Sequence, residues 1–134
     1  MDFETLIAGK NIALVGPALY MTNSNLGQEI DGHDLVIRIN RGIEVISTYP
    51  QDIGNRTDIL YSCLIETAAQ AGRLNARELK DDYGIKIICA PPQSSFTGYA
   101  HRTVFHGLVN RKTVDEIKKT IPIRLVDHVF HTRL

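Results

Sequence analysis

Short apolar runs alternate with polar turns along this chain, and their spacing predicts an α/β fold. The runs end in glycine, proline, asparagine or aspartate, which is typical of strands buried in a parallel sheet. Five of them are predicted as strands: 11–16, 33–40, 57–64, 85–91 and 123–130. Parallel strands need a crossover between each pair, so the polar segments between these runs are expected to contain helices.

Helical periodicity is found in four segments before or between the strands: 2–8, 25–30, 65–80 and 99–120. Within the third of these, Leu74 and Leu79 are expected to face the sheet, whereas 41–56 is expected to be mostly loop. The alternation of strands and helices favours right-handed crossovers. We therefore predict a single domain over 1–134 with a Rossmann-like, three-layer α/β/α architecture and a mostly parallel sheet.

The composition narrows the classes of function. Fifteen basic residues balance fifteen acidic residues among 134, so the chain has no net field to hold a nucleic acid or an anionic membrane surface. No apolar run reaches the roughly 18 residues of a membrane span. The first ten residues also lack the basic segment of a secretory signal. Nucleic acids are therefore not expected as partners, and no membrane span is predicted.

Two cysteines, Cys63 and Cys89, lie inside apolar runs and have no metal-ligand spacing around them. We expect both to be small buried thiols, and no metal site is predicted. Unpaired cysteines are typical of proteins from reducing compartments. A cytoplasmic location is therefore the expectation from this pattern.

Polar residues and glycine stand at the carboxyl ends of the first three predicted strands. Gly16 ends the first strand, Asn40 ends the second, and Ser62 lies near the end of the third; Ser24 lies in the loop after the first. Parallel α/β sheets bind ligands outside the carboxyl ends of their strands. Gly16, Asn40 and Ser62 are therefore candidate ligand contacts, with a plain turn glycine and an asparagine that caps the turn as the alternatives for Gly16 and Asn40. Ser24 could cap the helix expected over 25–30. There is no G-x-G-x-x-G or Walker pattern, so a dinucleotide or ATP site is not expected.

A compact polar turn precedes the third strand. Asp52 is expected to accept hydrogen bonds from backbone N–H groups there, and Gly54 is expected to take a positive φ. Arg56 is expected to pair with Asp31 or Asp34 and so to lock the loop. These residues are therefore predicted to support the site rather than to touch a ligand.

Alternation along the second strand divides its side chains between the two faces of the sheet. One face carries Val36, Arg38 and Asn40, and the other carries Leu35, Ile37 and Ile39. A buried arginine normally needs an acid, so Arg38 is predicted to form a structural ion pair with Asp31, Asp34 or Asp58. A direct contact between Arg38 and a ligand is the alternative.

A general base near neutral pH could come from any of the histidines: His33, His101, His106, His128 and His131. None of them stands in a pattern with a nucleophile or an acid that singles it out. The chain therefore contains candidates for the base, and the catalytic residue stays unassigned.

The polar and glycine residues between Val15 and Asp58 follow an order that resembles the large sialyl motif of the sialyltransferase family. That motif continues from a first strand to Gly-x-x-Ile-Asp-x-His-Asp, then to a strand ending in Arg-x-Asn, and later to Asp-x-Gly-x-Arg-Thr. The matching residues here are Gly16, Ser24, Gly27, Ile30, Asp31, His33, Asp34, Arg38, Asn40, Asp52, Gly54, Arg56 and Thr57. The match covers about a third of the chain and consists of polar residues and glycines, which makes it specific.

This resemblance implies a sialyltransferase-like glycosyltransferase. Such an enzyme transfers a sialyl group from CMP-sialic acid to a glycan hydroxyl, with inversion and without an obligatory metal or other cofactor. The implied partners are CMP or a CMP-sugar and a glycan acceptor. Asn40 stands where the family has an asparagine that meets the CMP portion, and Ser62 matches a further donor contact when a gap is allowed. The places of Gly16 and Ser24 in the motif imply that they also bind the donor nucleotide.

Several departures from the family pattern qualify these implications. Pro17 stands where the family has an asparagine after the glycine of the first strand, which removes a side-chain donor and a backbone N–H near the phosphate. Ile12 stands where vertebrate members carry a cysteine, so a microbial or viral type of member is expected. The small sialyl motif and its catalytic histidine are not found, and 92–99 is similar only to the opening of that motif.

These departures leave alternatives for the function. The chain is expected to be either the N-terminal part of a longer protein or a minimal fold without the catalytic half. A catalytically silent module that binds CMP or another nucleotide is one alternative, and a nucleotide-sugar hydrolase is another. Self-association into a homo-oligomer is a further expectation.

Overall fold

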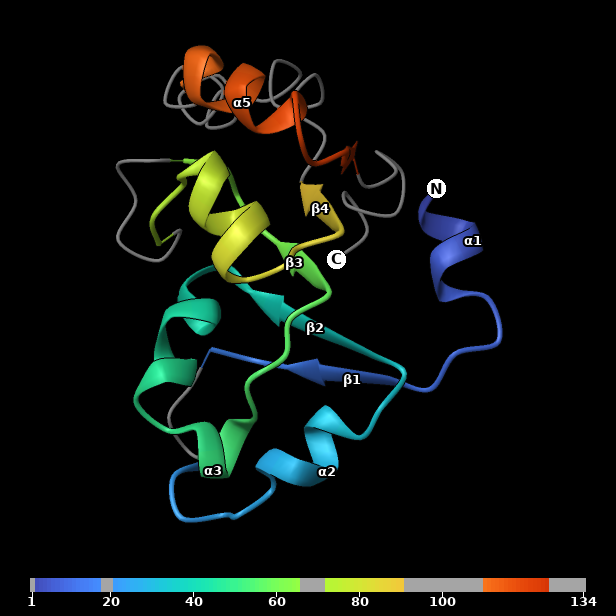
Figure 1. Cartoon of the computed structure of the whole chain (residues 1–134), viewed down its shortest axis with the longest axis vertical. Coiled ribbons are helices and arrows are strands. Elements are labelled where there is room, and N and C mark those ends of the chain that lie inside the picture. Colours follow the sequence, from blue (N-terminus) through green and yellow to red (C-terminus); the bar gives the residue numbers. More distant parts are fainter. Residues whose placement is uncertain (1, 18–20, 66–71, 91–109, 126–134) are drawn as a thin grey trace, which may run out of the picture.

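The computed structural model describes residues 2–17, 21–65, 72–90 and 110–125. Within these ranges five strands, all parallel, form one sheet in the order β1-β2-β3-β4-β5 (Figure 1). The strands are β1 (Ile12–Val15), β2 (Leu35–Ile39), β3 (Ile59–Tyr61), β4 (Ile87–Ala90) and β5 (Ile123–Leu125). The α/β fold with a mostly parallel sheet is therefore confirmed.

Short helices lie before and between the strands. They are α1 (Phe3–Ile7), α2 (Gly27–Asp31), the 3₁₀ helix η2 (Asn40–Ser47), α3 (Pro50–Ile53), the π-helical turn η4 (Glu78–Asp82) and α5 (Arg111–Lys118). The cap of α5 comes from Asn110, whose Oδ1 accepts hydrogen bonds from the N–H groups of Lys112 and Thr113 at 3.0 and 3.3 Å. Pro50 begins α3, where its fixed φ suits the first helical position.

One face of the sheet carries the larger part of the core. Leu60 of β3 and Ile88 of β4 pack there in a cluster with Ile117 of α5, and all three are almost completely buried. The same cluster contains side chains from η2, α3 and η4. Strands in sequential order, when joined by right-handed crossovers, place every crossover on the same side of the sheet. This explains why these elements share one face.

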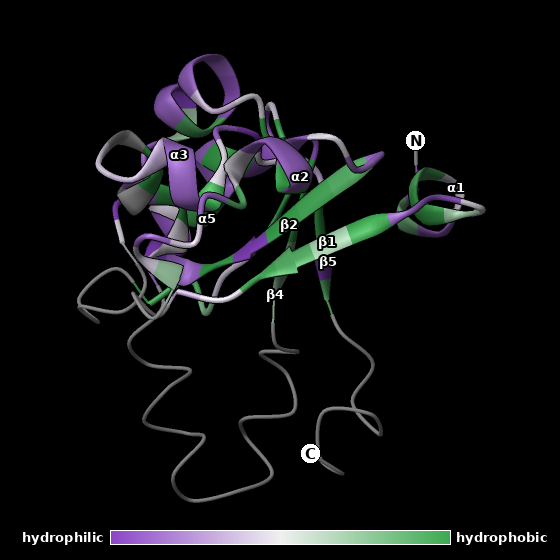
Figure 2. Ribbon diagram, turned by 90° about the horizontal axis from the view of Figure 1, so that it is seen from below, coloured by the Kyte–Doolittle hydropathy of each residue, from purple (hydrophilic) through white to green (hydrophobic). Residues whose placement is uncertain are grey.

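The opposite face is covered at one end by α1. Its side chains Phe3 and Leu6 pack against Ile59 and Cys89, which are buried. An ion pair of 2.6 Å between Glu4 of α1 and Arg124 of β5 lies beside this contact. The ribbons of β1 and β2 are largely green, the colour of hydrophobic residues, in Figure 2. Helical elements thus lie on both faces of the sheet, but the two layers are unequal.

Some expected elements differ from those observed. The segment 41–56 was expected to be mostly loop, but it contains η2 and α3. In the described part of the helix expected over 65–80, residues 72–75 are not helical and the π-helical turn η4 begins at Glu78, although Leu74 and Leu79 are both buried, as expected for residues that face the sheet. The strand expected over 123–130 is described only as β5, and its remainder lies outside the described residues, as do parts of the helices expected over 65–80 and 99–120.

Candidate functional site

The strongest candidate contact lies at the carboxyl ends of β2 and β3. Asn40 follows β2 directly and has a positive φ of 48°, a backbone conformation that asparagine adopts more readily than most residues. Its Oδ1 atom accepts a hydrogen bond of 3.0 Å from the backbone N–H of Cys63, just beyond β3. The oxygen of this carboxamide is therefore used within the protein. The Nδ2 group is the part that can donate to a ligand.

Ser62 lies beside this pair, but its side chain is completely buried. The hydroxyl accepts a hydrogen bond of 3.1 Å from the N–H of Leu64, which itself has a positive φ of 57°. Ser62 thus shapes the turn after β3. The contact between Ser62 and a donor nucleotide stays a prediction.

The loops after β1 and β2 meet at Gly42. A Cβ atom at Gly42 would lie 3.4 Å from the Cα of Pro17, so the two loops are in close contact there. Gly16 differs, because a Cβ added to it would have no neighbour within 4 Å. Among the described residues, nothing therefore requires glycine at position 16. The open space beside it agrees with its place at the carboxyl edge of the sheet.

Ser24 and Asp52 form a link between the loop after β1 and α3. The hydroxyl of Ser24 donates to the backbone oxygen of Asp52 at 3.2 Å. The carboxylate of Asp52 accepts from the N–H of Asn25 at 3.0 Å. Asp52 therefore accepts a backbone N–H group, as the sequence predicts. The structure places Ser24 in this link, and its predicted contact with the donor remains untested.

A second group of motif residues lies at the opposite, amino-terminal edge of the sheet. The Asp31 carboxylate accepts hydrogen bonds from the backbone N–H groups of Asn55, at 2.8 and 3.0 Å to its two oxygens, and of Arg56, at 3.0 Å. Gly54 approaches the same carboxylate closely and has a φ of 77°, as expected. The Asp34 carboxylate accepts from the N–H of Asn11 at 2.8 Å, before β1.

Arg56 locks this edge, but with partners other than those expected. Its guanidinium donates to the backbone oxygens of Asp31, His33 and Asp34 at 2.7, 2.6 and 3.0 Å. The guanidinium forms its ion pair with the carboxylate of Asp58, at 2.9 Å, and forms none with the carboxylates of Asp31 or Asp34. The predicted pairing was therefore wrong in its partner, because the backbone oxygens of the preceding turn lie nearer to the guanidinium.

Asp58 is the centre of the charge network at this edge. Its carboxylate also pairs with Lys86 at 2.9 Å and accepts the N–H of Val36 at 2.9 Å. Burial acts to raise the pKa of Asp58, but the hydrogen bonds and positive charges of these partners lower it below its ordinary value. Lys86 was not predicted from the sequence as a partner of Asp58. It directly precedes β4, just as Asp58 directly precedes β3. The parallel register places such residues side by side.

Arg38 is completely buried and lies between the two edges, on the face of β2 that also carries Val36. It donates from Nε to the Arg56 oxygen and the Thr57 hydroxyl, both at 3.0 Å, and from Nη2 to the Ile53 oxygen at 2.6 Å. Among the described residues it forms no ion pair, so the expected pairing with an acid was wrong. Burial lowers the pKa of Arg38. Carbonyl oxygens replace the acid because the 53–57 loop wraps around the guanidinium.

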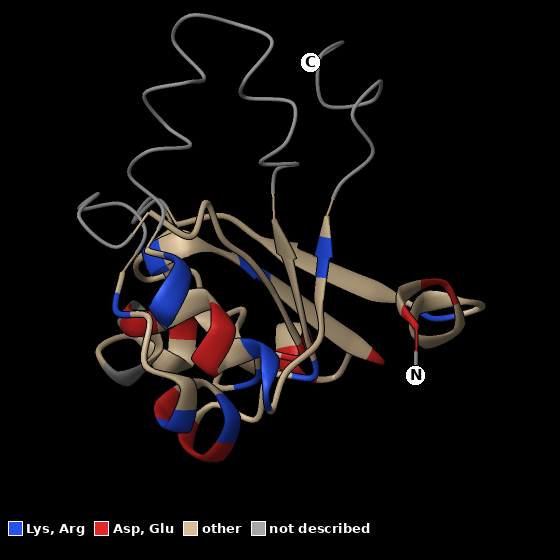
Figure 3. Ribbon diagram, turned by 90° about the horizontal axis from the view of Figure 1, so that it is seen from above, with Lys and Arg blue, Asp and Glu red and all other residues tan. Residues whose placement is uncertain are grey.

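The charges of the molecule are interspersed over its helices and loops, and the strands are nearly free of them (Figure 3).

His33 is the one histidine in the described ranges, and its Nδ1 lies 2.8 Å from the Glu29 oxygen before β2, at the edge away from Asn40. In the described part of the chain no three histidine, cysteine or acidic residues are grouped so that they could hold a metal ion. No helix in the same ranges is long and apolar enough to cross a membrane.

Comparison with known proteins agrees with the motif order. Residues 9–128 match the model of glycosyltransferase family 29 (sialyltransferase). The human alpha-N-acetylgalactosaminide alpha-2,6-sialyltransferase 1 is 47% identical over 45 residues, which are 34% of this chain and 7% of that protein. The beta-galactoside alpha-2,6-sialyltransferase 2 of Danio rerio is 46% identical over 50 residues, which are 37% of this chain and 9% of that protein. The matched segments thus span less than a tenth of either relative.

Proposed function

This chain belongs to glycosyltransferase family 29, the sialyltransferases, and we propose that it binds CMP-sialic acid at the carboxyl ends of β1, β2 and β3. The arrangement of Asn40 carries this proposal. Its backbone conformation and the Cys63 hydrogen bond hold the carboxamide in one orientation at the sheet edge. A fixed NH₂ donor at that edge suits an acceptor oxygen of the phosphate or ribose of CMP.

The transfer that follows is an inverting displacement. The hydroxyl oxygen of the glycan acceptor forms a bond to the anomeric carbon of the sialyl group. The bond from that carbon to the phosphate oxygen breaks, and CMP leaves with the electron pair. The hydroxyl proton passes to a base, which is not assigned to a residue. His33 lies at the other edge of the sheet and is therefore not proposed for this role.

The motif residues at the amino-terminal edge of the sheet are proposed to have a structural role. Asp31, Arg56 and Asp58 join the turns before β2 and β3 with hydrogen bonds of normal length. They lie at the edge opposite to Asn40, and they act by holding the register of the strands. Arg38 and Asp52 hold the loops between the two edges. We propose that none of these residues touches the donor.

Binding is tested by calorimetric titration with CMP, AMP, GMP and UMP. The proposal predicts tighter binding of CMP than of the other three nucleotides. Equal affinity for all four nucleotides would contradict the proposal that this site binds the CMP portion of the donor. The same sample is then incubated with CMP-sialic acid, with and without lactose. CMP release that requires lactose indicates transfer, release without lactose indicates hydrolysis, and binding without release indicates a catalytically silent module.

The location and assembly of the protein belong to the same proposal. Cys63 and Cys89 are both free thiols, which supports a reducing, cytoplasmic setting. Fractionation of the cells that make the protein tests the location. Light scattering of the purified chain tests the expected self-association, and a mass that stays at one chain across the concentration range would contradict it.

A further inference from the structure

Leu64 has a backbone conformation that leucine seldom adopts. Its φ is 57°, in the left-handed region, and its side chain is almost completely buried. A Cβ atom makes this region unfavourable, and leucine lacks the short polar side chain with which asparagine tolerates it. Such a residue keeps its conformation only where its surroundings fix it, and residues of this kind are concentrated at functional sites.

The backbone N–H groups of the turn after β3 have three different partners. The N–H of Ser62 continues the sheet with a hydrogen bond of 2.9 Å to the oxygen of Cys89 in β4. The next N–H, that of Cys63, donates to the Oδ1 of Asn40 at 3.0 Å. The N–H of Leu64 donates back to the Ser62 hydroxyl at 3.1 Å. The left-handed residue thus ends a turn whose middle N–H group reaches the carboxamide that is proposed to bind the donor.

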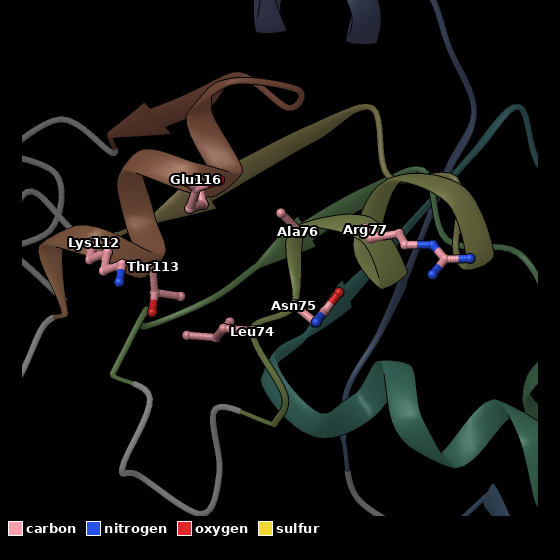
Figure 4. A pocket seen from close by; sticks show the side chains of 7 residues that line it. All are labelled: Leu74, Asn75, Ala76, Arg77, Lys112, Thr113 and Glu116. Carbon is pink, nitrogen blue, oxygen red and sulfur yellow. The ribbon is translucent and has the colours of Figure 1, made fainter.

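The side chain of Leu64 fixes this turn to the core. It is only 1% exposed and belongs to the core cluster that also contains Ile43 of η2, the helix that begins at Asn40. Figure 4 shows Leu74, another member of this cluster, pointing toward Thr113 of α5. The same apolar cluster therefore holds both sides of the hydrogen bond: the turn after β3 and the helix after β2.

We propose that Leu64 is a positioning residue for donor binding. Its buried side chain holds the left-handed turn, and the turn aims the N–H of Cys63 at the Oδ1 of Asn40. This hydrogen bond leaves the Nδ2 group of Asn40 directed at the donor. Asn40 also has a positive φ, so a left-handed residue after each strand shapes the two sides of the bond. Leu64 itself does not touch the donor, and its role rests on the proposed function, in which Nδ2 binds CMP.

The test separates the backbone conformation of Leu64 from its apolar packing. Leu64→Val keeps an apolar side chain, but its branched Cβ disfavours a positive φ. Leu64→Met has no branch at Cβ and keeps a similar volume. Calorimetry with CMP should show a loss of affinity of about fivefold or more for Leu64→Val, roughly the loss of one hydrogen bond, and less than about twofold for Leu64→Met. Urea unfolding first establishes that each variant is folded at the temperature of the titration.

The matched control is Leu79→Val. Leu79 lies in η4, is also 1% exposed and belongs to the same core cluster. The substitution removes the same methylene group from the core without a left-handed residue, so CMP should bind as it does to the wild type. Equal weakening by Leu64→Val and Leu79→Val would assign the effect to the core as a whole and would overturn the proposal. Unchanged CMP affinity in folded Leu64→Val would overturn it too.

A measurement without ligand distinguishes this proposal from the proposed function. The side-chain NH₂ signals of Asn40 are followed by NMR in the ¹⁵N-labelled chain, and their absence in Asn40→Asp assigns them. Leu64→Val should move these signals, whereas Leu64→Met and Leu79→Val should leave them in place. Unmoved signals in Leu64→Val would refute the positioning role even where the wild type binds CMP. Moved signals together with a wild type that binds no CMP would refute the proposed function alone.

Discussion

Gly54 lies so close to Asp31 that a Cβ atom at position 54 would stand 2.4 Å from the Asp31 Oδ1 atom. The same carboxylate accepts the N–H groups of Asn55 and Arg56. The turn before β3 can therefore close over Asp31 only when position 54 has no side chain. A positive φ of 77° adds a second requirement for glycine.

Gly54→Ala should accordingly destabilise the fold by about 3 kcal/mol or more, from left-handed strain together with the clash. Gly84→Ala is the matched control, because Gly84 also has a positive φ, of 70°, but a Cβ there meets nothing within 4 Å. It should cost only about 1–2 kcal/mol. Urea unfolding of both variants measures the difference, and equal losses would show that the contact with Asp31 contributes nothing.

The pH dependence of stability should reveal the charge network around Asp58. The pKa of Asp58 is lowered in the folded protein, so its contribution is complete above the ordinary value of about 4 and is lost as the pH falls through the folded pKa. Asp58→Asn should be less stable than wild type at pH 7 by about 1–3 kcal/mol, because Lys86 and Arg56 lose their partner.

The measurement is the free energy of unfolding from pH 7 down to pH 2. The difference between wild type and Asp58→Asn should shrink below about pH 4. Asp115→Asn, on the exposed side of α5, serves as the control and should follow the wild-type curve. A constant difference at every pH would contradict the assignment of the effect to the charge of Asp58.

The two cysteines should differ in reactivity. Burial raises the pKa of Cys89 to about 11, so at pH 8 only about one thiol in a thousand is ionised. Cys63 is partly exposed. Iodoacetamide at pH 8 should therefore modify Cys63 in the native protein and reach Cys89 only after unfolding in urea, as followed by peptide mass spectrometry.

A Cys63→Ser variant provides the control for this labelling. It should take up no reagent while it is folded and one label when it is unfolded. Modification of Cys89 in the native variant at a rate comparable to that of Cys63 in the wild type would show that the face under α1 opens readily.

The strands could be predicted from the sequence because a short apolar run that ends in turn residues can be recognised within a few neighbouring positions. In β2 the alternation assigns the side chains to the two faces of the sheet, and the structure confirms Val36 on one face and Leu35 on the other, both of them buried. The segment after Asn40 was not predictable in this way. A short 3₁₀ helix that follows a residue with positive φ depends on packing rather than on periodicity.

The sequence predicted that these motif residues support the site, but it did not predict which groups they contact. Arg38 and Arg56 were expected to support the site, and both hold turns through hydrogen bonds. Their principal partners are backbone oxygens. Every residue has one, so the sequence does not show which of them will accept the hydrogen bond. Lys86 was missed for a related reason, since its contact with Asp58 arises from the register of β3 and β4.

Binding of CMP to Asn40→Asp tests the central claim most directly. Aspartate tolerates the positive φ and keeps an oxygen for the N–H of Cys63, but it replaces the NH₂ donor by a negative charge. Asn11→Asp, before β1, adds the same charge at the opposite edge and serves as the control. Calorimetry with CMP should show at least a tenfold loss of affinity for Asn40→Asp, since a hydrogen bond to a charged group contributes about 1.5–3 kcal/mol. Asn11→Asp should bind normally. Unchanged CMP affinity in a folded Asn40→Asp protein would contradict the account.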